Sequence, residues 1–276
     1  MKLSIITINF NNRAGLQKTI DSVISQTYKD FEWIIIDGGS TDGSKELIEQ
    51  YDKYITYWVS EPDKGIYNAM NKGIKVAKGE YLQFLNSGDC LYSSNTLDNV
   101  FKINRTADVL YGDIIVSENN IIVAQRRFNF KLSLRFFIDD TLNHQASFCR
   151  KETFKNEMYD EKYKMCSDRK HFIRLLLTCA KFEYVGIPIV NYDNTGISSN
   201  QAFKRKQHQE RDLILKECLG NNLDDYYHLI TLEEIARNEL VVLALKIFQT
   251  NKLSRFIIRH SMNLILFINK LCRKFQ

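Results

Sequence analysis

Short apolar runs alternate with segments of helical apolar spacing over the first hundred residues, and this alternation constrains the fold most strongly. The apolar runs are Leu3–Ile8, Phe31–Ile36, Ile55–Val59 and Tyr81–Leu85, and the helical segments are Leu16–Ile24, Lys45–Tyr51 and Ile66–Ala77. Strands that are apolar almost throughout are typical of a mostly parallel sheet flanked by helices. Ligands bind such sheets at the carboxyl ends of the strands, so polar residues that follow the runs are candidate site residues.

The pattern changes after about residue 109. We expect a hairpin from Leu110–Val116 and Ile121–Gln125, a strand at Ala146–Cys149, a helix over Asp168–Thr178 and a last strand at Val185–Val190. Beyond Ser199 the spacing indicates only helices. We therefore predict an α/β domain over residues 1–199 and a helical C-terminal region over 200–276, without a proline-rich linker, because the chain has two prolines.

Composition narrows the class of protein. Hydrophobic residues make up 44% and charged residues 26% of the chain, as in ordinary globular domains. The N-terminal sequence MKLSIITINFNN soon turns polar and has no small-residue cleavage site, which argues against a secretory signal. The 6 cysteines form no CxxC pair. We therefore expect a cytoplasmic protein without a disulfide framework or a structural zinc.

Residues 251–276 form a basic stretch without Asp or Glu. It contains Lys252, Arg255, Arg259, Lys270, Arg273 and Lys274, with apolar blocks at Phe256–Ile258 and Leu264–Ile268. No part of it is apolar for long enough to cross a bilayer. The pattern is typical of a helix that lies on a membrane surface, and a helix packed on the domain is the alternative. Nucleic-acid binding would use exposed aromatic and polar side chains rather than an aliphatic block, so we expect no nucleic-acid partner.

Polar groups follow three of the predicted strands. Asn9 follows the first run, Asp37 opens the turn DGGSTDGS after the second, and Asn86–Asp89 follows Tyr81–Leu85. An acid at the end of a parallel strand can hydrogen-bond a nucleoside, although GGSTDG lacks dinucleotide-binding glycine spacing. Asp63 and Lys64 precede the helix that begins near Ile66, where a phosphate would be attracted. Alternatively, DGGSTDGS is a glycine-rich turn into a helix, Asp63 is a helix cap and Lys64 is a solvated charge.

Several motifs together resemble those of family 2 glycosyltransferases. They are SIITINFNN, IIIDGGSTDGS, EPDKGIYNAMNKGIKVAKGEYLQFLNSGD and HQASFCRKETF with DEKYKMCSDRKHFIRL. The likeness is dense over residues 1–90, weaker to Ser199 and absent beyond. Within the family the chain is most similar to bacterial capsule, O-antigen and exopolysaccharide enzymes. The resemblance implies a GT-A fold, a Rossmann-like mixed and mostly parallel sheet flanked by helices, with a helical C-terminal appendage.

The resemblance also implies roles for residues that would bind the donor. Thr7, Asn9 and Asp37 match positions that hold the nucleoside, and Asp63 and Lys64 match a segment beside the nucleotide. The family's metal-binding motif falls on Asn86-Ser87-Gly88-Asp89, which places Ser87 and Gly88 beside the donor and makes Asp89 the expected metal ligand.

The expected metal is Mn²⁺ or Mg²⁺. Gly88 stands where many relatives have an acid, so we expect one protein carboxylate on the metal. These ions keep waters and accept phosphate oxygens, and they neutralise charge on a leaving nucleoside diphosphate. For Asp89 the alternative is a turn residue.

The acceptor side is assigned in the same way. Asp168 matches the base that takes a proton from the acceptor hydroxyl, and a helix cap is the alternative. Lys170 stands where relatives often carry a second acid. The resemblance places Asp113, His144 and Gln145 near the donor sugar or the acceptor. It also makes Gly196-Ile197-Ser198 a loop that closes over the diphosphate.

The function predicted is metal-dependent, inverting transfer of a sugar from a nucleotide sugar, expected to be a UDP-sugar. The acceptor would be a hydroxyl of a glycan or a lipid-linked saccharide in bacterial surface polysaccharide synthesis, with residues 251–276 at the inner face of the cell membrane. One alternative is a sugar nucleotidyltransferase, which needs a Gly-rich basic loop that Asn11–Gly15 hardly provides. Another is a non-catalytic, membrane-associated subunit that binds nucleotide or a partner transferase. Its support is Gly88 and Lys170, which stand where relatives often carry acids.

Overall fold

A computed structural model of the chain describes residues 1–118, 121–193 and 201–237. It divides into two compact units, Met1–Cys218 and a second that begins at Leu219. The predicted loop Gly196–Ser198 and the basic stretch 251–276 lie outside the described residues, so the expectations attached to them stay predictions.

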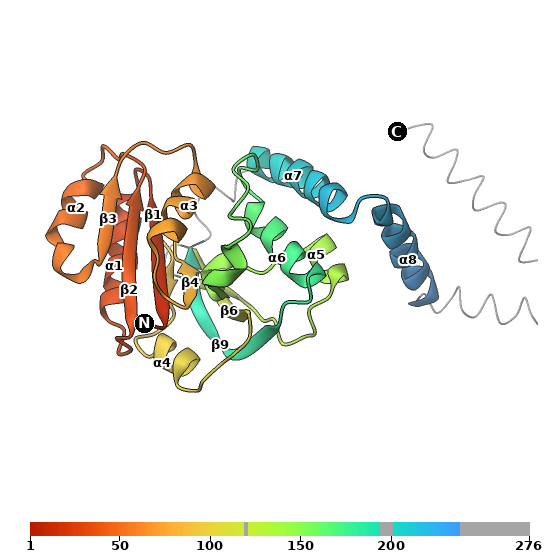
Figure 1. Cartoon of the computed structure of the whole chain (residues 1–276), viewed down its shortest axis with the longest axis horizontal. Helices are drawn as coiled ribbons and strands as arrows, with labels where there is room; N and C mark the ends of the chain where they lie inside the picture. Colours follow the sequence, from red (N-terminus) through yellow and green to blue (C-terminus); the bar gives the residue numbers. More distant parts are fainter. Residues whose placement is uncertain (119–120, 194–200, 238–276) are drawn as a thin grey trace, which may run out of the picture. The chain divides into compact units, whose positions relative to one another are not determined.

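One nine-stranded sheet organises the first unit (Figure 1), in the order β3-β2-β1-β4-β8-β6-β9-β5 with β7 beside β6. The strands are β1 (Leu3–Asn9), β2 (Phe31–Asp37), β3 (Tyr57–Ser60), β4 (Tyr81–Phe84), β5 (Cys90–Leu91), β6 (Val109–Glu118), β7 (Ile121–Arg126), β8 (Ser147–Arg150) and β9 (Phe182–Asp193). Strands β3, β2, β1 and β4 are parallel. The antiparallel strand β8 joins β4 to β6, which runs parallel to β9. The predicted mixed α/β sheet is confirmed.

Helices flank this sheet (Figure 1). They are α1 (Arg13–Ile24), α2 (Ser44–Gln50), α3 (Ile66–Val76), α4 (Thr96–Phe101), α5 (Leu134–Asp139), α6 (Ser167–Leu177) and α7 (Gln201–Leu219), with 3₁₀ turns at Asp52–Tyr54, His144–Ala146 and Lys151–Phe154. Helix α1 is capped by Asn12, whose Oδ1 accepts the N–H of Gly15. Helix α3 comes so close to β1 that a Cβ on Gly73 would lie 2.4 Å from Cγ2 of Ile6. A side chain at position 73 would therefore push α3 off the sheet.

The core lies where the apolar runs pair in the sheet. Every residue of β1 is buried, and so are all residues of β2 after Phe31. Burying each large aliphatic side chain contributes about 1.5–3 kcal/mol. Because both faces of these central strands are buried, apolar residues stabilise them at nearly every position, and polar and apolar residues hardly alternate. Central parallel strands thus give the N-terminal half a rigid frame.

Some elements differ from the sequence predictions. Strand β3 begins two residues later than Ile55, because Asp52–Tyr54 forms a 3₁₀ turn. Strand β9 is longer than Val185–Val190, because its first residues pair with β6 from Val109 onward. The short elements β5, α4 and α5 are absent from the sequence predictions, since each has too few residues to show a period.

The second unit is described as far as α8 (Asn222–Arg237), on which Leu229 is 57% exposed.

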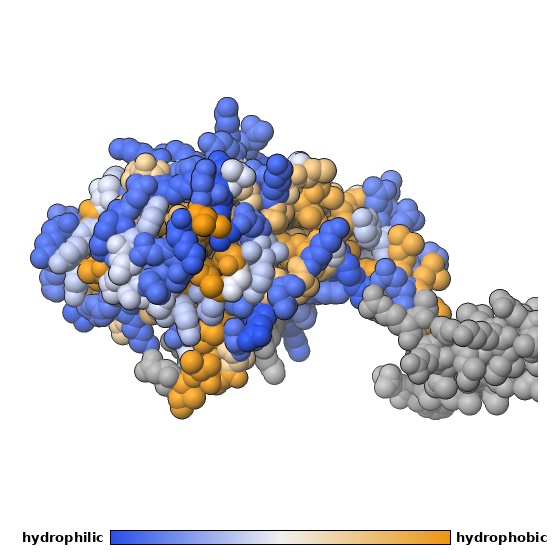
Figure 2. Space-filling view, turned by 90° about the horizontal axis from the view of Figure 1, so that it is seen from below, coloured by the Kyte–Doolittle hydropathy of each residue, from blue (hydrophilic) through white to orange (hydrophobic). Residues whose placement is uncertain are grey.

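No helix within residues 1–118, 121–193 and 201–237 is long and apolar enough to span a bilayer. Figure 2 shows a largely hydrophilic face on which apolar residues form separate patches.

Candidate active site

The strand order reverses at β1, which makes the carboxyl end of this strand the place to look for a site. From β1 the chain proceeds to β2 and β3 on one side, and then returns to β4 on the other side of β1. Loops that follow β1 and β4 therefore diverge at a topological switch point, where ligands bind open α/β sheets. The register also aligns Asn9, Asp37 and Ser60 at the ends of three neighbouring strands. Residues from separate sequence motifs thus meet at one edge.

Asp37 lies at the centre of this edge and is completely buried. Its Oδ1 accepts Nδ2 of Asn9 at 2.7 Å and Oγ of Ser40 at 2.6 Å. Its Oδ2 accepts the N–H of Ser40 at 2.9 Å and Oγ of Ser60 at 2.6 Å. Burial raises the pKa of Asp37, but the bonds from Ser40, Ser60 and Asn9 outweigh it and lower the pKa overall. Asp37 is therefore an ionised carboxylate that organises the ends of β1, β2 and β3.

The other two residues predicted to hold the nucleoside have different surroundings. Thr7 is fully buried within β1, and its hydroxyl accepts Nε1 of Trp33 at 3.0 Å. Asn9 is 4% exposed, and among the described residues its buried Oδ1 has no hydrogen-bond partner. This acceptor lies beside Asp37 at the end of β1, whereas the Thr7 hydroxyl is already paired within the sheet.

Asp63 reaches the same edge from the start of α3. Its Oδ1 accepts the N–H of Gly65 at 2.8 Å, and a Cβ added to Gly38 would lie 2.5 Å from its Oδ2. The carboxylate of Asp63 thus packs on the turn that follows Asp37, where only glycine leaves room. Lys64 is exposed at the surface beside it.

The loop Asn86–Asp89 is fastened to β1 and α1. The N–H and Oγ of Ser87 both donate to the carbonyl of Ile8, at 3.0 and 3.1 Å. Gly88 has a φ of 106°, a conformation that favours glycine, and its N–H donates to Oγ1 of Thr19 at 3.0 Å. Asp89 is 6% exposed. These hydrogen bonds hold the loop beside the end of β1 and the start of α1.

The donor set suits a metal only in part. Among the described residues no cluster of three or more His, Cys, Asp or Glu could hold an ion. Asp89 supplies one carboxylate, and Mg²⁺ or Mn²⁺ accepts one carboxylate when phosphate oxygens and waters complete its shell. A metal at Asp89 would therefore need phosphate oxygens and waters as its other ligands.

A hydrogen-bonded chain connects this loop to α6. Nδ2 of Asn86 lies 3.1 Å from Nε2 of His144, and Nδ1 of His144 lies 2.8 Å from Oδ2 of Asp168. Oδ1 of Asp168 accepts the Tyr67 hydroxyl at 2.9 Å and the N–H of Arg169 at 2.9 Å. Residues from a 3₁₀ turn, α3 and α6 thus converge on one carboxylate, and His144 connects it to the loop after β4.

Asp168 is buried yet ionised. Burial raises its pKa, but hydrogen bonding and charge interaction with His144, with further bonds from Tyr67 and Arg169, lower the pKa overall. Burial and the neighbouring carboxylate raise the pKa of Tyr67 well above its usual value, so Tyr67 stays a hydrogen-bond donor. Asp168 is the second residue of α6, and Cys166, not Asp168, occupies the N-cap position. Asp168 is therefore not the N-cap residue, and besides one first-turn N–H, that of Arg169, its carboxylate bonds Tyr67 and His144.

The segment before α6 is held from two sides. From α3, Nδ2 of Asn71 donates to the carbonyl of Tyr159 and to Oε1 of Glu161. From α7, the carboxylate of Glu210 accepts the N–H groups of Lys164, Met165 and Cys166 at 2.7, 2.8 and 3.1 Å. Neither contact was predicted from the sequence, because each joins distant segments. Together they fix the backbone that presents Asp168.

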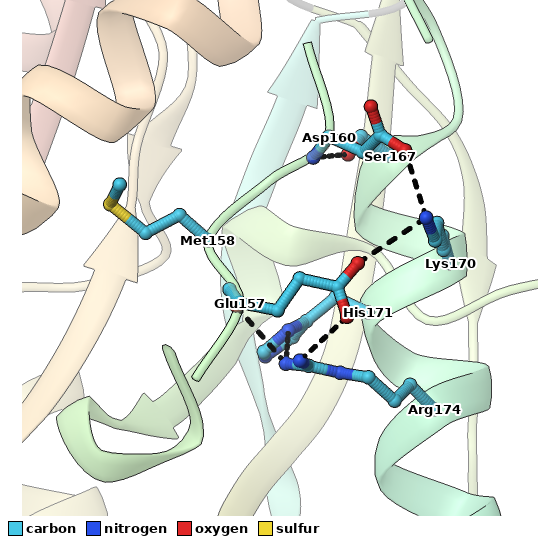
Figure 3. Close-up of a pocket in the computed structure, with 7 residues that line it drawn as sticks. All are labelled: Glu157, Met158, Asp160, Ser167, Lys170, His171 and Arg174. Carbon is cyan, nitrogen blue, oxygen red and sulfur yellow. Dashed lines mark hydrogen bonds and ion pairs between the residues drawn. The ribbon is translucent and has the colours of Figure 1, made fainter. Parts of the chain in front are cut away.

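Lys170 points into an ion-pair cluster (Figure 3). Its Nζ lies 2.8 Å from Oδ2 of Asp160, 2.7 Å from Oε1 of Glu217 and 3.3 Å from Oε1 of Glu157. Bonds from Lys162, Lys170 and Tyr163 lower the pKa of Glu217 to about 2. Lys170, which the resemblance aligned with an acid, therefore links α6 to α7 through its ion pair with Glu217.

Two further predicted residues have structural partners. Asp113 is buried, and its Oδ1 accepts the hydroxyl of Tyr184 at 2.7 Å and the N–H of Phe128 at 3.1 Å. The main-chain carbonyl of Gln145 accepts Nε2 of Gln83 at 2.8 Å. None of the bonds described for Asp113 reaches Asp168, whereas Gln145 follows His144 directly within the 3₁₀ turn.

Comparison with known proteins shows the family. Residues 4–161 match the model of Glycosyl transferase family 2. An uncharacterized glycosyltransferase of Mycobacterium tuberculosis is 33% identical over 210 residues, which cover 72% of this chain and 78% of that protein. A PGL/p-HBAD biosynthesis glycosyltransferase of Mycobacterium bovis is 31% identical over 208 residues, or 71% of this chain and 78% of that protein.

Solved structures share the fold at low identity. TarS of S. aureus in complex with UDP-GlcNAc superposes with a TM-score of 0.62 at 21% identity, over 81% of this chain and 73% of that one. The mannosyltransferase PcManGT of Pyrobaculum calidifontis, in complex with GDP-Man and Mn²⁺, gives a TM-score of 0.61 at 12% identity, over 96% of this chain and 80% of that one. The chain belongs to glycosyl transferase family 2 and is a glycosyltransferase with a GT-A-like fold.

Proposed function

We propose that this glycosyltransferase moves a sugar, with inversion, from a nucleotide sugar to a hydroxyl of a glycan or a lipid-linked saccharide. The observation that carries the proposal is the hydrogen-bonded chain from Asn86 to Asp168, because it joins the loop suited to a diphosphate to a buried, ionised base. A UDP-sugar is the donor we propose, and TarS was crystallised with UDP-GlcNAc. The named relatives are mycobacterial and include one of PGL/p-HBAD biosynthesis, so we propose surface glycan synthesis without singling out capsule or O-antigen.

The donor would lie across the carboxyl ends of β1, β2 and β4. Asn9 has a buried, unmet acceptor, and the Asp37 oxygens are held by two serine hydroxyls, so a nucleoside would reach either residue only when the side chains around it move. Asp63 and Lys64 would flank the nucleotide, and Ser87 and Gly88 the diphosphate. Asp89 would hold the Mn²⁺ or Mg²⁺, which supplies charge neutralisation for the leaving diphosphate.

Asp168 would act as the base. In an inverting transfer the acceptor hydroxyl attacks the sugar from the face opposite the diphosphate, and its proton must leave as the new bond forms. The carboxylate of Asp168 is ionised, and the two atoms that hold it from α3 and the 3₁₀ turn leave it little freedom to rotate. It is therefore oriented before the substrate arrives.

The wider organisation is also a proposal. We place the catalytic domain at residues 1–199 and a helical region at 200–276, although the first compact unit continues to Cys218 through the contacts of α7 with α6. The basic stretch 251–276 would hold the enzyme at the cytoplasmic face of a membrane.

A donor screen tests the proposal. Purified protein is mixed with UDP-, GDP- and dTDP-sugars, with and without Mn²⁺, and both thermal stabilisation and product release are measured. Slow release of nucleoside diphosphate and sugar from one donor is expected. Release of pyrophosphate would instead indicate the nucleotidyltransferase. Binding without any turnover, also in the presence of saccharide acceptors, would indicate the non-catalytic subunit.

A further inference from the structure

We propose that His144 is a positioning residue that holds Asp168 and ties it to the donor loop, an inference that rests on the proposed function. Both ring nitrogens of His144 are engaged by protein atoms, Nδ1 with Oδ2 of Asp168 and Nε2 with Nδ2 of Asn86. The sequence prediction placed His144 against sugar or acceptor. The bonds described here direct the ring toward the base instead.

The network defines which nitrogen carries the proton. The ionised carboxylate of Asp168 can only accept, so Nδ1 of His144 carries the hydrogen of that bond. That N–H points at Oδ2 of Asp168 over 2.8 Å, and the side chains of both residues are 12% exposed. A donor at this distance in a nearly dry site gives a strong, charge-assisted bond.

The same bonds leave one position on the carboxylate for a substrate. A carboxylate has about four lone-pair positions. Oδ1 of Asp168 accepts Tyr67 and the N–H of Arg169, and Oδ2 accepts His144. The described bonds thus leave the second lone pair of Oδ2 to receive the acceptor's proton. His144 and Tyr67 together fix where that lone pair points.

Asn86 makes the arrangement a link between the two substrates. It lies two residues after the end of β4 and opens the loop Asn86–Asp89, which is fastened to β1 through Ser87. Movement of this loop would therefore shift the carboxylate of Asp168, because His144 contacts both. We infer that the network sets the separation between the base and the sugar carbon that it serves.

Three substitutions separate this role from others. His144→Asn places an amide N–H near the position of Nδ1, His144→Gln places its amide near Nε2, and His144→Ala removes both. We expect His144→Asn to keep kcat within about threefold of wild type. His144→Gln and His144→Ala should lose about 10- to 100-fold in kcat with little change in the KM of the donor, as for loss of one charge-assisted bond.

The pH profile distinguishes positioning from packing. The groups that face Asp168 are Tyr67, His144, Tyr159, Cys166, Arg169 and His171. Because the His144 bond lowers the pKa of Asp168, its loss moves the acidic limb of kcat to higher pH in the Gln and Ala variants. The limb should stay in place in the Asn variant. Thermal melts with donor present verify that each variant is folded.

Two results would overturn the inference. Wild-type kcat and an unmoved limb in His144→Ala would show that His144 does not act on Asp168, and equal impairment of the Asn and Ala variants would show that the imidazole itself is required. ¹⁵N NMR of the wild-type imidazole gives a readout without turnover, and we expect a hydrogen on Nδ1. The opposite tautomer contradicts the inference, whereas a wild-type protein inactive on every donor contradicts only the proposed function.

Discussion

Lowering the pH should decrease the free energy of unfolding of the first unit because of His171 on α6. This imidazole is 4% exposed and stacks on Phe154 at a centroid distance of 4.1 Å. Nδ1 accepts Nη2 of Arg174 at 3.1 Å, and Nε2 lies 3.3 Å from Oγ1 of Thr153. Burial, followed by repulsion from Arg174, lowers the pKa of His171 from its usual 6.5 to about 3.

The sign and size follow from proton linkage. Below pH 6.5 the unfolded chain binds a proton at His171, whereas the folded chain does not bind it until about pH 3. The free energy of unfolding therefore decreases as the pH is lowered through this window. Between pH 7 and pH 5 this group alone removes about 2 kcal/mol of it.

Urea unfolding measured by tryptophan fluorescence provides the assay. The chain has 2 tryptophans, Trp33 and Trp58, and both belong to the first unit, so the signal reports on that unit. His171→Gln keeps hydrogen-bonding groups but does not titrate. We expect the wild-type free energy to fall about 2 kcal/mol more than that of the variant from pH 7 to pH 5. Equal pH dependence of the two proteins would refute a neutral, buried His171.

Two further predictions concern the donor loop and α7. Asp89→Ala should weaken Mn²⁺-dependent binding of a nucleoside diphosphate by at least about tenfold in calorimetry, since a metal ligand is lost, and unchanged affinity would remove Asp89 from that role. Glu210→Gln should lower the urea midpoint by the equivalent of about 1–3 kcal/mol, because a charged acceptor of three N–H groups is lost. Asp212→Asn, at an exposed ion pair with Arg211, is the matched control, and an equal effect of the two changes would contradict the assigned role of Glu210.

The sequence predicts the N-terminal fold well because its strands are central. Leu3–Asn9 and Phe31–Asp37 are buried on both faces, so each reads as a continuous apolar run. Short edge elements such as Cys90–Leu91 carry no period and were missed. Their place depends on pairing with β9, a partner about a hundred residues away.

The site was predicted as a set of residues but not as a network. Asn9, Asp37 and Asn86–Asp89 could be placed together, because parallel strands end at the same edge. The bond of Tyr67 to Asp168 joins residues 101 positions apart, and no local pattern announces it. Tyr67 lies within the motif EPDKGIYNAM, so its place at the start of a helix beside the site was the available signal. Asp37, predicted to hold the nucleoside, also accepts hydrogen bonds from Asn9, Ser40 and Ser60, which local sequence cannot show.

The central claim is that Asp168 is the base of a glycosyl transfer. The most direct measurement compares wild type and Asp168→Asn in transfer from the donor found by the screen, with donor affinity measured by calorimetry on the same samples. The variant keeps the size of the side chain and donor binding, and we expect kcat to fall by about 10²- to 10⁴-fold while Kd stays within about threefold. Near-normal turnover in Asp168→Asn would contradict the account.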